Sequence, residues 1–231
     1  MTPVVLSVVP VEGMPEIGAG DDLAALLLEA LPNEGLADRD IVVITQKVVS
    51  KAEGRIVPAA QKAEVIQEES RRILRRTPGG MVISETRHGF VCANAGVDAS
   101  NVDVEHIVLL PLDPDASARS IRARLEHLSG KDLGVVISDT FGRAWRVGQT
   151  DVAIGVAGFE ALMDYRGTAD TQGRELFATR IAVADQIAGA AELVMGKADN
   201  ICAAIVRGAR VRFGRGAAAD LVRPPAEDLF R

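Results

Sequence analysis

The chain of 231 residues is 48% hydrophobic and 25% charged, a balance typical of a folded globular protein. Its formal net charge of −6 argues against a general binder of nucleic acid or of anionic membranes. No apolar stretch approaches the ~20 residues that span a bilayer, and the N-terminus reads as a strand, not as a signal peptide. We therefore expect a cytoplasmic protein without nucleic-acid or membrane partners.

In chain order, the first half alternates predicted strands and helices. β-branched runs bounded by Gly, Pro or Asp predict the strands, and longer amphipathic or leucine-rich runs predict the helices. The elements expected are a strand at Val4–Val9, a helix at Asp21–Leu31, a strand at Ile41–Thr45, a helix at Ala59–Arg76, and strands at Met81–Ser84, Gly89–Ala93 and Ile107–Leu110. Since Met81–Ala93 reads as a hairpin, we expect a mixed sheet and not a purely parallel one.

The second half continues the same alternation around one long irregular region. The elements expected are a helix at Ala116–Leu128 with Asp115 or Ser117 as N-cap and Gly130 beyond its end, a strand at Gly134–Ser138, a helix at Leu176–Met195 that ends at Gly196, and a strand at Ala203–Val206. The composition of Asp151–Gly173 predicts an ordered loop, and such loops are usually functional. The fold class expected is α/β with a mixed, α+β-like sheet, and Arg223 onward reads as a surface tail.

Several catalytic templates have no support in the sequence. His88, His106 and His127 show no metal-binding spacing, and no GxSxG motif for a nucleophilic serine is present. Cys92 and Cys202 lie in apolar surroundings without a CxxC pattern, which favours buried small hydrophobes over a redox or metal role. Metal-assisted chemistry on a phosphate is the hypothesis that stays open.

Two oxygen-rich segments each follow a predicted strand. In Asn94–Asn101, small residues would let backbone N–H groups approach a phosphate, and Asp98 supplies a hard oxygen ligand. Asp139 and Thr140 form a second oxygen pair at the end of another strand, where open α/β sheets collect ligands. Taken alone, Asn94–Asn101 is more typical of a capped turn, and Asp139-Thr140 could also be an N-cap or turn, but two such oxygen pairs in one chain strengthen the metal hypothesis.

Three further segments offer groups that could bind an anion or a nucleotide. Arg143 and Arg146 could grip a carboxylate or phosphate, or could form surface ion pairs. Lys51 lies in a basic stretch after a strand that is not a Walker A loop, and Pro10–Gly13 is a tight turn that could lie over a base or ribose. Trp145 could pack in the core or line a pocket.

Five ordered motifs resemble one known family over nearly the whole chain, from Pro10 to about Gly208. The motifs are TQKVVSKAEGR, NAGVDASNV, VVISDTFGRAWRVGQTDVAIG, DYRGTADTQGRE and ELVMGKADN. They are similar to those of the coenzyme F420-0:L-glutamate ligases, the γ-glutamyl ligases of deazaflavin coenzyme biosynthesis. The resemblance implies an intertwined two-part α/β fold that dimerises, formed here by residues 1–231 as a single ligase unit without a fused reductase domain.

The resemblance also implies a reaction. GTP phosphorylates the terminal carboxylate of F420-0, the amine of L-glutamate attacks the acyl phosphate, and further γ-linked glutamates can follow. Mg²⁺ or Mn²⁺ is required, and K⁺ assists. A metal-dependent phosphatase or hydrolase with the same carboxylates, or a non-catalytic nucleotide or deazaflavin binder, stays open as an alternative.

Position by position, the resemblance implies a set of site residues. Metal would be held by Asp98, Asp139 and Thr140; nucleotide by Pro10, Val11, Glu12, Gly13, Gln46, Lys51, Asn101, Met195, Gly196, Lys197, Ala198, Asp199, Asn200, Ile201 and Cys202; and Asp139, Arg143 and Arg146 would act in catalysis. Lys197 stands where the family pattern leads us to expect a glutamine near a second metal. A protonated lysine cannot ligate a metal, so this departure weakens the case for two metals and for strict GTP preference.

Overall fold

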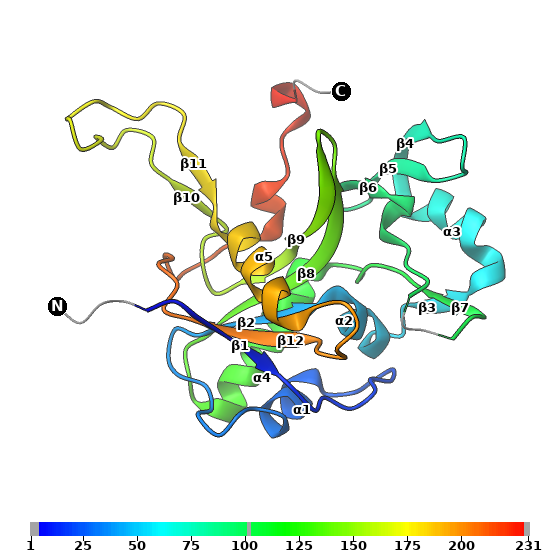
Figure 1. The fold of residues 1–231 in the computed structure, drawn as a ribbon, viewed down its shortest axis with the longest axis horizontal. Coiled ribbons are helices and arrows are strands. Elements are labelled where there is room, and N and C mark those ends of the chain that lie inside the picture. Colours follow the sequence, from blue (N-terminus) through cyan, green and yellow to red (C-terminus); the bar gives the residue numbers. More distant parts are fainter. Residues whose placement is uncertain (1–4, 101–102, 229–231) are drawn as a thin grey trace.

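A five-stranded mixed sheet forms the centre of the computed structural model, which describes residues 5–100 and 103–228 (Figure 1). Its order is β1 (Ser7–Val11), β12 (Ala203–Arg207), β2 (Ile41–Thr45), β8 (Gly134–Arg143) and β9 (Arg146–Ala157). Only β2 and β8 pair in parallel; the other three neighbouring pairs are antiparallel. The predicted mixed α/β sheet is therefore confirmed.

Helices cover both faces of this sheet, which explains why its central strands are apolar on both sides. Val42 and Ile44 of β2 pack in a cluster with α1 (Leu23–Glu29) and α4 (Pro114–Ser129). Their neighbours, Ile41 and Val43, pack on the opposite face with α5 (Val183–Met195). The period-two alternation of one strand thus builds two cores, and Figure 1 shows α5 lying across the sheet on the near side.

A second, smaller part of the fold lies between α2 (Gln46–Ala52) and α4 in sequence. It contains β3 (Ile56–Pro58), the 3-10 helix η1 (Ala59–Gln61), α3 (Lys62–Glu69), β4 (Ser70–Arg76), β5 (Val82–Thr86), β6 (Val91–Ala93), the 3-10 helix η2 (Asn94–Gly96) and β7 (His106–Val108). Strands β4, β5 and β6 form one antiparallel sheet, and β3 pairs with β7. A third hydrophobic cluster, which includes Val65, Val82 and Ile107, stabilises this part.

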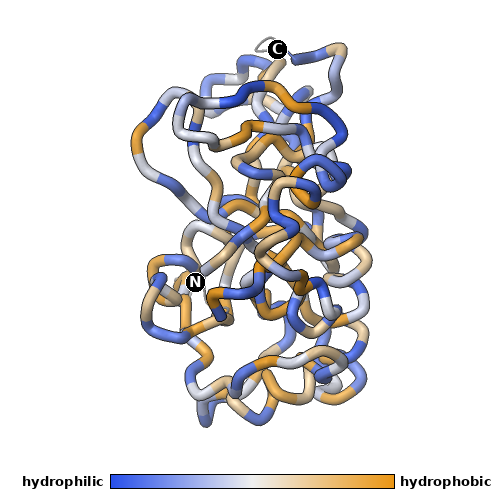
Figure 2. Tube along the Cα trace, turned by 90° about the vertical axis from the view of Figure 1, so that its right-hand side faces the viewer, coloured by the Kyte–Doolittle hydropathy of each residue, from blue (hydrophilic) through white to orange (hydrophobic). Residues whose placement is uncertain are grey.

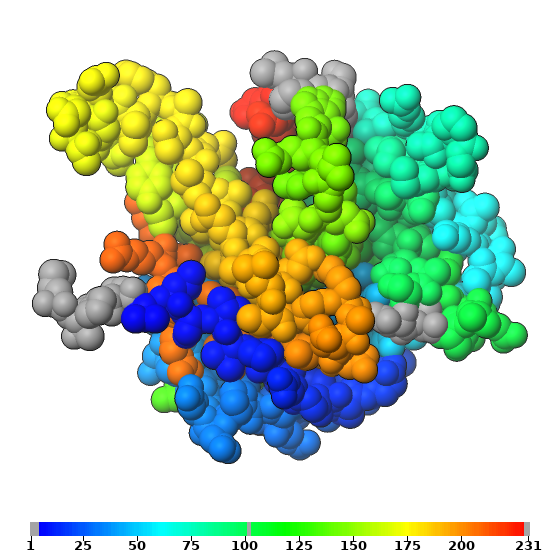
Figure 3. Space-filling view, viewed as in Figure 1, coloured from blue at the N-terminus to red at the C-terminus, as the bar shows by residue number. Residues whose placement is uncertain are grey.

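Two strand pairs extend from the body of the molecule. The β8–β9 hairpin stands out as a ridge in Figure 3, and the ribbon of β10 (Leu162–Asp164) and β11 (Arg180–Ala182) carries the arm at the upper left. Figure 2 shows hydrophobic stretches running through the body of the molecule, with hydrophilic stretches between them. Two 3-10 helices, η3 (Ala218–Leu221) and η4 (Pro225–Glu227), follow β12. None of the helices in the described ranges is long and apolar enough to cross a membrane.

The predicted helix at Ala59–Arg76 is wrong in its second half. The helix ends at Glu69, and Ser70 turns the backbone into an extended conformation that begins β4. The Ser70 hydroxyl donates to the carbonyl of Ile66 and lies 2.8 Å from the Ser84 hydroxyl on β5, which fixes the junction. Pairing with β5 overrides the helical preference of a charged, arginine-rich segment.

Three other boundaries are corrected. The predicted loop Asp151–Gly173 begins inside a strand, because Asp151 to Ala157 belong to β9. The predicted helix Leu176–Met195 begins only at Val183, after β11. Helix α4 starts earlier than predicted, at Pro114, because Asp113 is its N-cap and accepts a hydrogen bond from the Ala116 N–H at 2.9 Å.

Candidate functional site

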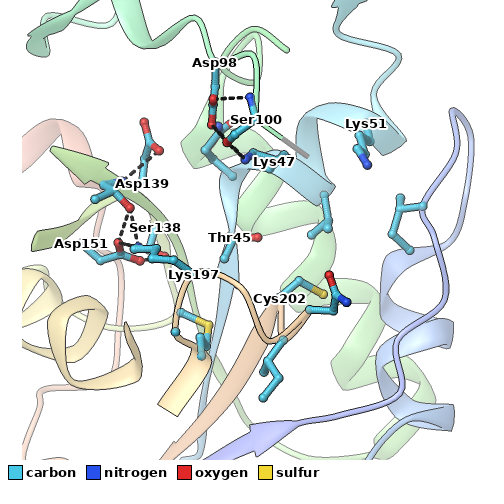
Figure 4. Close-up of a pocket in the computed structure, with 18 of the residues that line it drawn as sticks. Thr45, Lys47, Lys51, Asp98, Ser100, Ser138, Asp139, Asp151, Lys197 and Cys202 are labelled. Carbon is cyan, nitrogen blue, oxygen red and sulfur yellow. Dashed lines mark hydrogen bonds and ion pairs between the residues drawn. The ribbon is translucent and has the colours of Figure 1, made fainter. Parts of the chain in front are cut away.

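Strand β2 ends at Thr45, opposite Ser138 of its parallel neighbour β8, and a cavity of about 820 Å³ opens at this edge of the sheet (Figure 4). Five chain segments line it: the loop after β1, the start of α2, the loop after β6, the β8–β9 strands, and the turn after α5. Ligands of open α/β sheets collect at such strand ends. The topology therefore brings together polar residues that lie far apart in the sequence.

Asp151 organises the floor of the cavity. It stands opposite Thr140 in the β8–β9 register and is 3% exposed. Its carboxylate accepts hydrogen bonds from the Ser138 hydroxyl at 2.9 Å and from the Thr140 hydroxyl at 2.6 Å. Asp139 lies between these two hydroxyl residues in the sequence, and its Oδ1 accepts the Thr140 N–H at 2.9 Å.

Lys197 reaches this floor from the turn after α5. Its Nζ lies 2.9 Å from Asp151 Oδ1, 2.6 Å from Thr140 Oγ1 and 2.8 Å from Glu192 Oε1. The turn depends on Gly196, whose φ is 61° and where a Cβ would lie 2.3 Å from the Asp199 carboxylate. An L side chain would be strained at this φ, so glycine lets the chain fold back towards the sheet, while the exposed Asp199 side chain could move aside.

Asp98 belongs to a second polar group, beside the first in Figure 4. Its carboxylate lies 2.9 Å from Lys47 Nζ on α2 and accepts from the Ser100 hydroxyl and N–H. Backbone bonds with Val108 fix Asp98 in place. Burial opposes ionisation of Asp98, but the hydrogen bonds from Lys47 and Ser100 prevail and hold its pKa below the usual value.

Asp139 has the opposite electrostatic character. Burial raises the pKa of Asp139 to about 7, against the Thr140 N–H bond, which lowers it, and with further increases from the nearby Asp151 and Asp98 charges. Burial, with a smaller contribution from Asp139, also raises the pKa of the Cys92 thiol to about 12. Carboxylates held this close together at the base of a cavity favour a bound cation.

The start of α2 supplies a hydrogen-bond donor that is still available. Gln46 is 1% exposed, its Oε1 accepts from the Ser50 hydroxyl at 3.0 Å, and its Nε2 has no hydrogen-bond partner within the described residues. Lys51, one turn further on, pairs with the exposed Glu16. A buried amide without a partner at a cavity wall is a group that a ligand would satisfy.

The loop before Asp98 has an unusual backbone. Asn94, Ala95 and Gly96 follow one another with φ values of 51°, 55° and 74°. A Cβ at Gly96 would lie 2.6 Å from Leu110, so this position admits only glycine. Such left-handed runs cluster at ligand sites, and here the run aims Asp98 at the cavity.

The cavity collects most of the predicted site residues. Those that line it are Gln46, Lys51, Asp98, Asp139, Thr140, Met195, Gly196, Lys197, Asn200, Ile201 and Cys202. The structure places Pro10 and Val11 in β1, Glu12 and Gly13 just before the lining segment that starts at Met14, and Ala198 and Asp199 in the turn after α5. Asn101 lies outside the described residues, so its predicted nucleotide contact stays a prediction.

Arg143 and Arg146 are not brought to the cavity. They stand opposite each other in the strand register at the tip of the β8–β9 hairpin, and the Arg143 guanidinium donates to the carbonyls of Val147 and Gly148. Four residues of extended strand, about 13 Å, separate Arg143 from Asp139. Trp145 at the same tip is 73% exposed, so it neither packs in the core nor lines the cavity.

The sequence interpretation missed Lys47, Asp151 and Glu192. Asp151 lay in the segment predicted as a loop, although Val152, Ile154 and Val156 alternate with smaller residues in the manner of a strand. That alternation was the available signal. Lys47 lay in the basic stretch after β2 from which Lys51 was the only lysine chosen, whereas Glu192 gave no signal, because only the tertiary structure brings it to the cavity.

The donor set indicates what the site can bind. No cluster of three His, Cys, Asp or Glu residues with metal-site geometry occurs within residues 5–100 and 103–228. Carboxylates at Asp98 and Asp139, a free amide at Gln46, and lysines at positions 47 and 51 nevertheless face one cavity. Oxygen ligands with adjacent cations suit a divalent metal that is shared with the phosphates of a ligand.

Comparison with known proteins identifies the family. A family model described as F420-0:Gamma-glutamyl ligase matches residues 13–208. The coenzyme F420:L-glutamate ligase of Methanothermobacter thermautotrophicus is 45% identical over 98% of this chain and 99% of its own length. Those of Methanocaldococcus jannaschii and Methanopyrus kandleri are 43% and 42% identical, over 89% and 98% of this chain and 90% and 98% of their own lengths. The chain therefore belongs to the F420-0:gamma-glutamyl ligase family.

Proposed function

We propose that the protein is a ligase that joins L-glutamate to coenzyme F420-0 at the expense of GTP. The terminal carboxylate of F420-0 accepts the γ-phosphoryl group, and the glutamate amine displaces phosphate from the acyl phosphate to form the amide. Further γ-linked glutamates can be added in the same way. The observation that carries this proposal is the family match over the chain, together with a cavity where carboxylates and lysines converge at the end of β2, beside Ser138–Thr140 of β8.

A divalent metal, Mg²⁺ or Mn²⁺, fits the residues at the base of the cavity. Within the described part of the chain, the Thr140 N–H is the hydrogen-bond donor to Asp139, which leaves the second carboxylate oxygen available to a cation. Burial and, to a smaller extent, the charges of Asp151 and Asp98 raise the pKa of Asp139, and a bound metal would offset the cost of its ionised form. Asp139 and Asp98 would hold the ion, and it would supply charge neutralisation for the phosphates.

The other residues of the cavity position the reactants. Gln46 and Lys51 would bind the nucleotide through the free Nε2 and the ammonium, and the Gly196–Cys202 turn would lie against it. Lys47, beside Asp98, would bring a second positive charge towards the phosphates. Holding two anions at attack distance is the main difficulty of this reaction, and fixed cations reduce their repulsion. Arg143 and Arg146 would contact whatever part of the acceptor extends beyond the cavity along the hairpin.

Four further features belong to the same proposal. They are the use of GTP in preference to other nucleotides, assistance by K⁺, a homodimeric assembly and a cytoplasmic location. Light scattering tests the assembly, and nucleotide competition tests the preference.

The direct test is incubation of the full chain with F420-0, GTP, Mn²⁺ and L-glutamate, followed by mass spectrometry and assay of GDP. The proposal expects a mass gain of one glutamyl unit for each GDP released, and no GDP without acceptor. GDP release that is indifferent to F420-0 and glutamate would instead indicate a phosphatase or hydrolase. Tight GTP binding without any turnover would indicate a non-catalytic binder.

A further inference from the structure

One side chain in the cavity occupies a position that would suit a bound ion. The Thr140 hydroxyl, the Asp151 carboxylate and the Glu192 carboxylate surround one point, and the ammonium of Lys197 lies at it. We call these three oxygens the Lys197 cage. The distances from Nζ to Thr140 Oγ1, Asp151 Oδ1 and Glu192 Oε1 are 2.6, 2.9 and 2.8 Å.

Other contacts fix the oxygens of the cage independently of Lys197. Asp151 is 3% exposed and accepts the Ser138 and Thr140 hydroxyls. Glu192 accepts the Asp151 N–H through its other oxygen at 2.9 Å, so β9 holds the α5 carboxylate in place. Two carboxylates and a hydroxyl converging on one point form the kind of oxygen set that binds hard cations.

The ammonium has no donor left for a ligand. A lysine carries three N–H donors and no acceptor, and the cage has three oxygens within hydrogen-bond distance. Although 57% of the Lys197 side-chain surface is exposed, Nζ itself is directed at the buried Asp151. Lys197 is therefore a fixed positive charge in the floor of the cavity and not a phosphate-binding side chain.

We propose that Lys197 is the internal cation of this site and fills the place that a second bound ion would take between Thr140, Asp151 and Glu192. The proposal deepens the proposed function, because it assumes that the same cavity takes a divalent metal at Asp98 and Asp139. The wild-type chain then takes up one metal ion at those two carboxylates and none in the Lys197 cage.

Removing the ammonium tests the proposal. The number of Mn²⁺ ions bound per chain is measured by electron paramagnetic resonance of free Mn²⁺ for the wild type, Lys197→Met and Lys197→Arg, with Lys131→Met as a control at a lysine outside the cavity. Lys197→Gln is measured in parallel, because it removes the charge but keeps a polar side chain if the Met variant folds poorly. The Met or Gln variant is expected to bind one Mn²⁺ more than the wild type, whereas the Arg and Lys131 variants match the wild type.

A second measurement covers larger ions, because the cage oxygens lie 2.6 to 2.9 Å from its centre, wider than the ~2.0–2.1 Å of Mg²⁺ coordination. Melting temperatures are compared in KCl and in tetramethylammonium chloride at equal ionic strength. If the Met or Gln variant takes up no extra Mn²⁺, its melting temperature is expected to be higher in KCl than in tetramethylammonium chloride. The melting temperature of the wild type is expected to be the same in both salts.

The outcomes separate this inference from the proposed metal at Asp98 and Asp139. A wild type that binds no Mn²⁺ while the Met variant binds one supports the Lys197 cage and contradicts the metal at the two aspartates. A wild type that already binds two Mn²⁺ ions shows that metal displaces Lys197 and overturns the inference. Equal Mn²⁺ numbers in wild type and variants, without a K⁺-specific effect, overturn it as well.

Discussion

Replacing Asp139 by Asn should abolish metal-dependent turnover and stabilise the metal-free protein. Asn keeps the side-chain oxygen that accepts the Thr140 N–H, but it carries no charge among Asp98, Asp151 and the cavity wall. The ionised carboxylate is unfavourable in the folded state because burial and its neighbours raise its pKa to about 7. A site that is built to bind a cation is therefore strained when the cation is absent.

The expected gain in the free energy of unfolding follows from the shift in the pKa of Asp139. A rise of the Asp139 pKa from 3.8 to about 7 corresponds to about 4 kcal/mol, at 1.36 kcal/mol per unit. Since Asp139 is partly exposed to the cavity, water reduces this penalty, and we expect Asp139→Asn to raise the free energy of unfolding by about 2–4 kcal/mol at pH 8.

The raised pKa of Asp139 also determines how the stability of the folded protein changes with pH. Below pH ~4 the carboxyl is protonated in both folded and unfolded states, so the stabilising contribution of the raised pKa is fully present. As the pH rises through about 7 the folded protein must also ionise Asp139, and that contribution is lost. The advantage of Asp139→Asn over the wild type should therefore be small at pH 5 and largest at pH 8.

Urea denaturation in EDTA at pH 5 and pH 8 measures both free energies. Asp98→Asn is the matched comparison, because hydrogen bonds to Lys47 and Ser100 lower the pKa of Asp98, and its loss should destabilise the protein above pH ~4. Added Mn²⁺ should raise the melting temperature of the wild type but not of Asp139→Asn. An Asp139→Asn protein that is less stable than the wild type at pH 8, or fully active, would refute the reasoning.

Two further substitutions test the packing and the ligand contacts. Gly155→Ala should lower the free energy of unfolding by about 2–3 kcal/mol in urea denaturation, because its Cβ would lie 2.3 Å from the Pro114 carbonyl oxygen. Gly142→Ala, which meets nothing within 4 Å, should be neutral, and equal effects of the two would contradict this packing. Gln46→Met should weaken GDP binding about tenfold by calorimetry, because the unpartnered Nε2 would be lost; unchanged affinity would exclude that contact.

The central sheet could be predicted from the sequence because the residues within each of its strands are enough to indicate a strand. The β-branched runs at Ile41–Thr45 and Gly134–Ser138 are short, apolar and bounded by polar residues, and each forms a strand. Ser70–Arg76 could not be predicted, since its residues favour a helix and only β5 makes it a strand. The loop prediction at Asp151–Gly173 followed composition and overlooked the alternation in its first seven residues.

The candidate site, like the fold, could be predicted only in part from the sequence. Asp98, Asp139 and Thr140 stand out because oxygen-bearing side chains follow apolar strands, and the cavity includes all three. Glu192 and Lys197 are five residues apart on α5 and its turn, and their position beside Thr140 depends on how α5 packs against β9. Arg143 was placed near Asp139 by sequence distance, but an extended strand carries it away from the cavity.

The central claim is that an acceptor carboxylate is phosphorylated in this cavity before the amine of L-glutamate attacks. F420-0 labelled with ¹⁸O in its terminal carboxylate, incubated with GTP, Mn²⁺ and L-glutamate, tests this claim directly. One ¹⁸O atom should be transferred to each released phosphate while the glutamylated product forms. Product formation accompanied by unlabelled phosphate would contradict it.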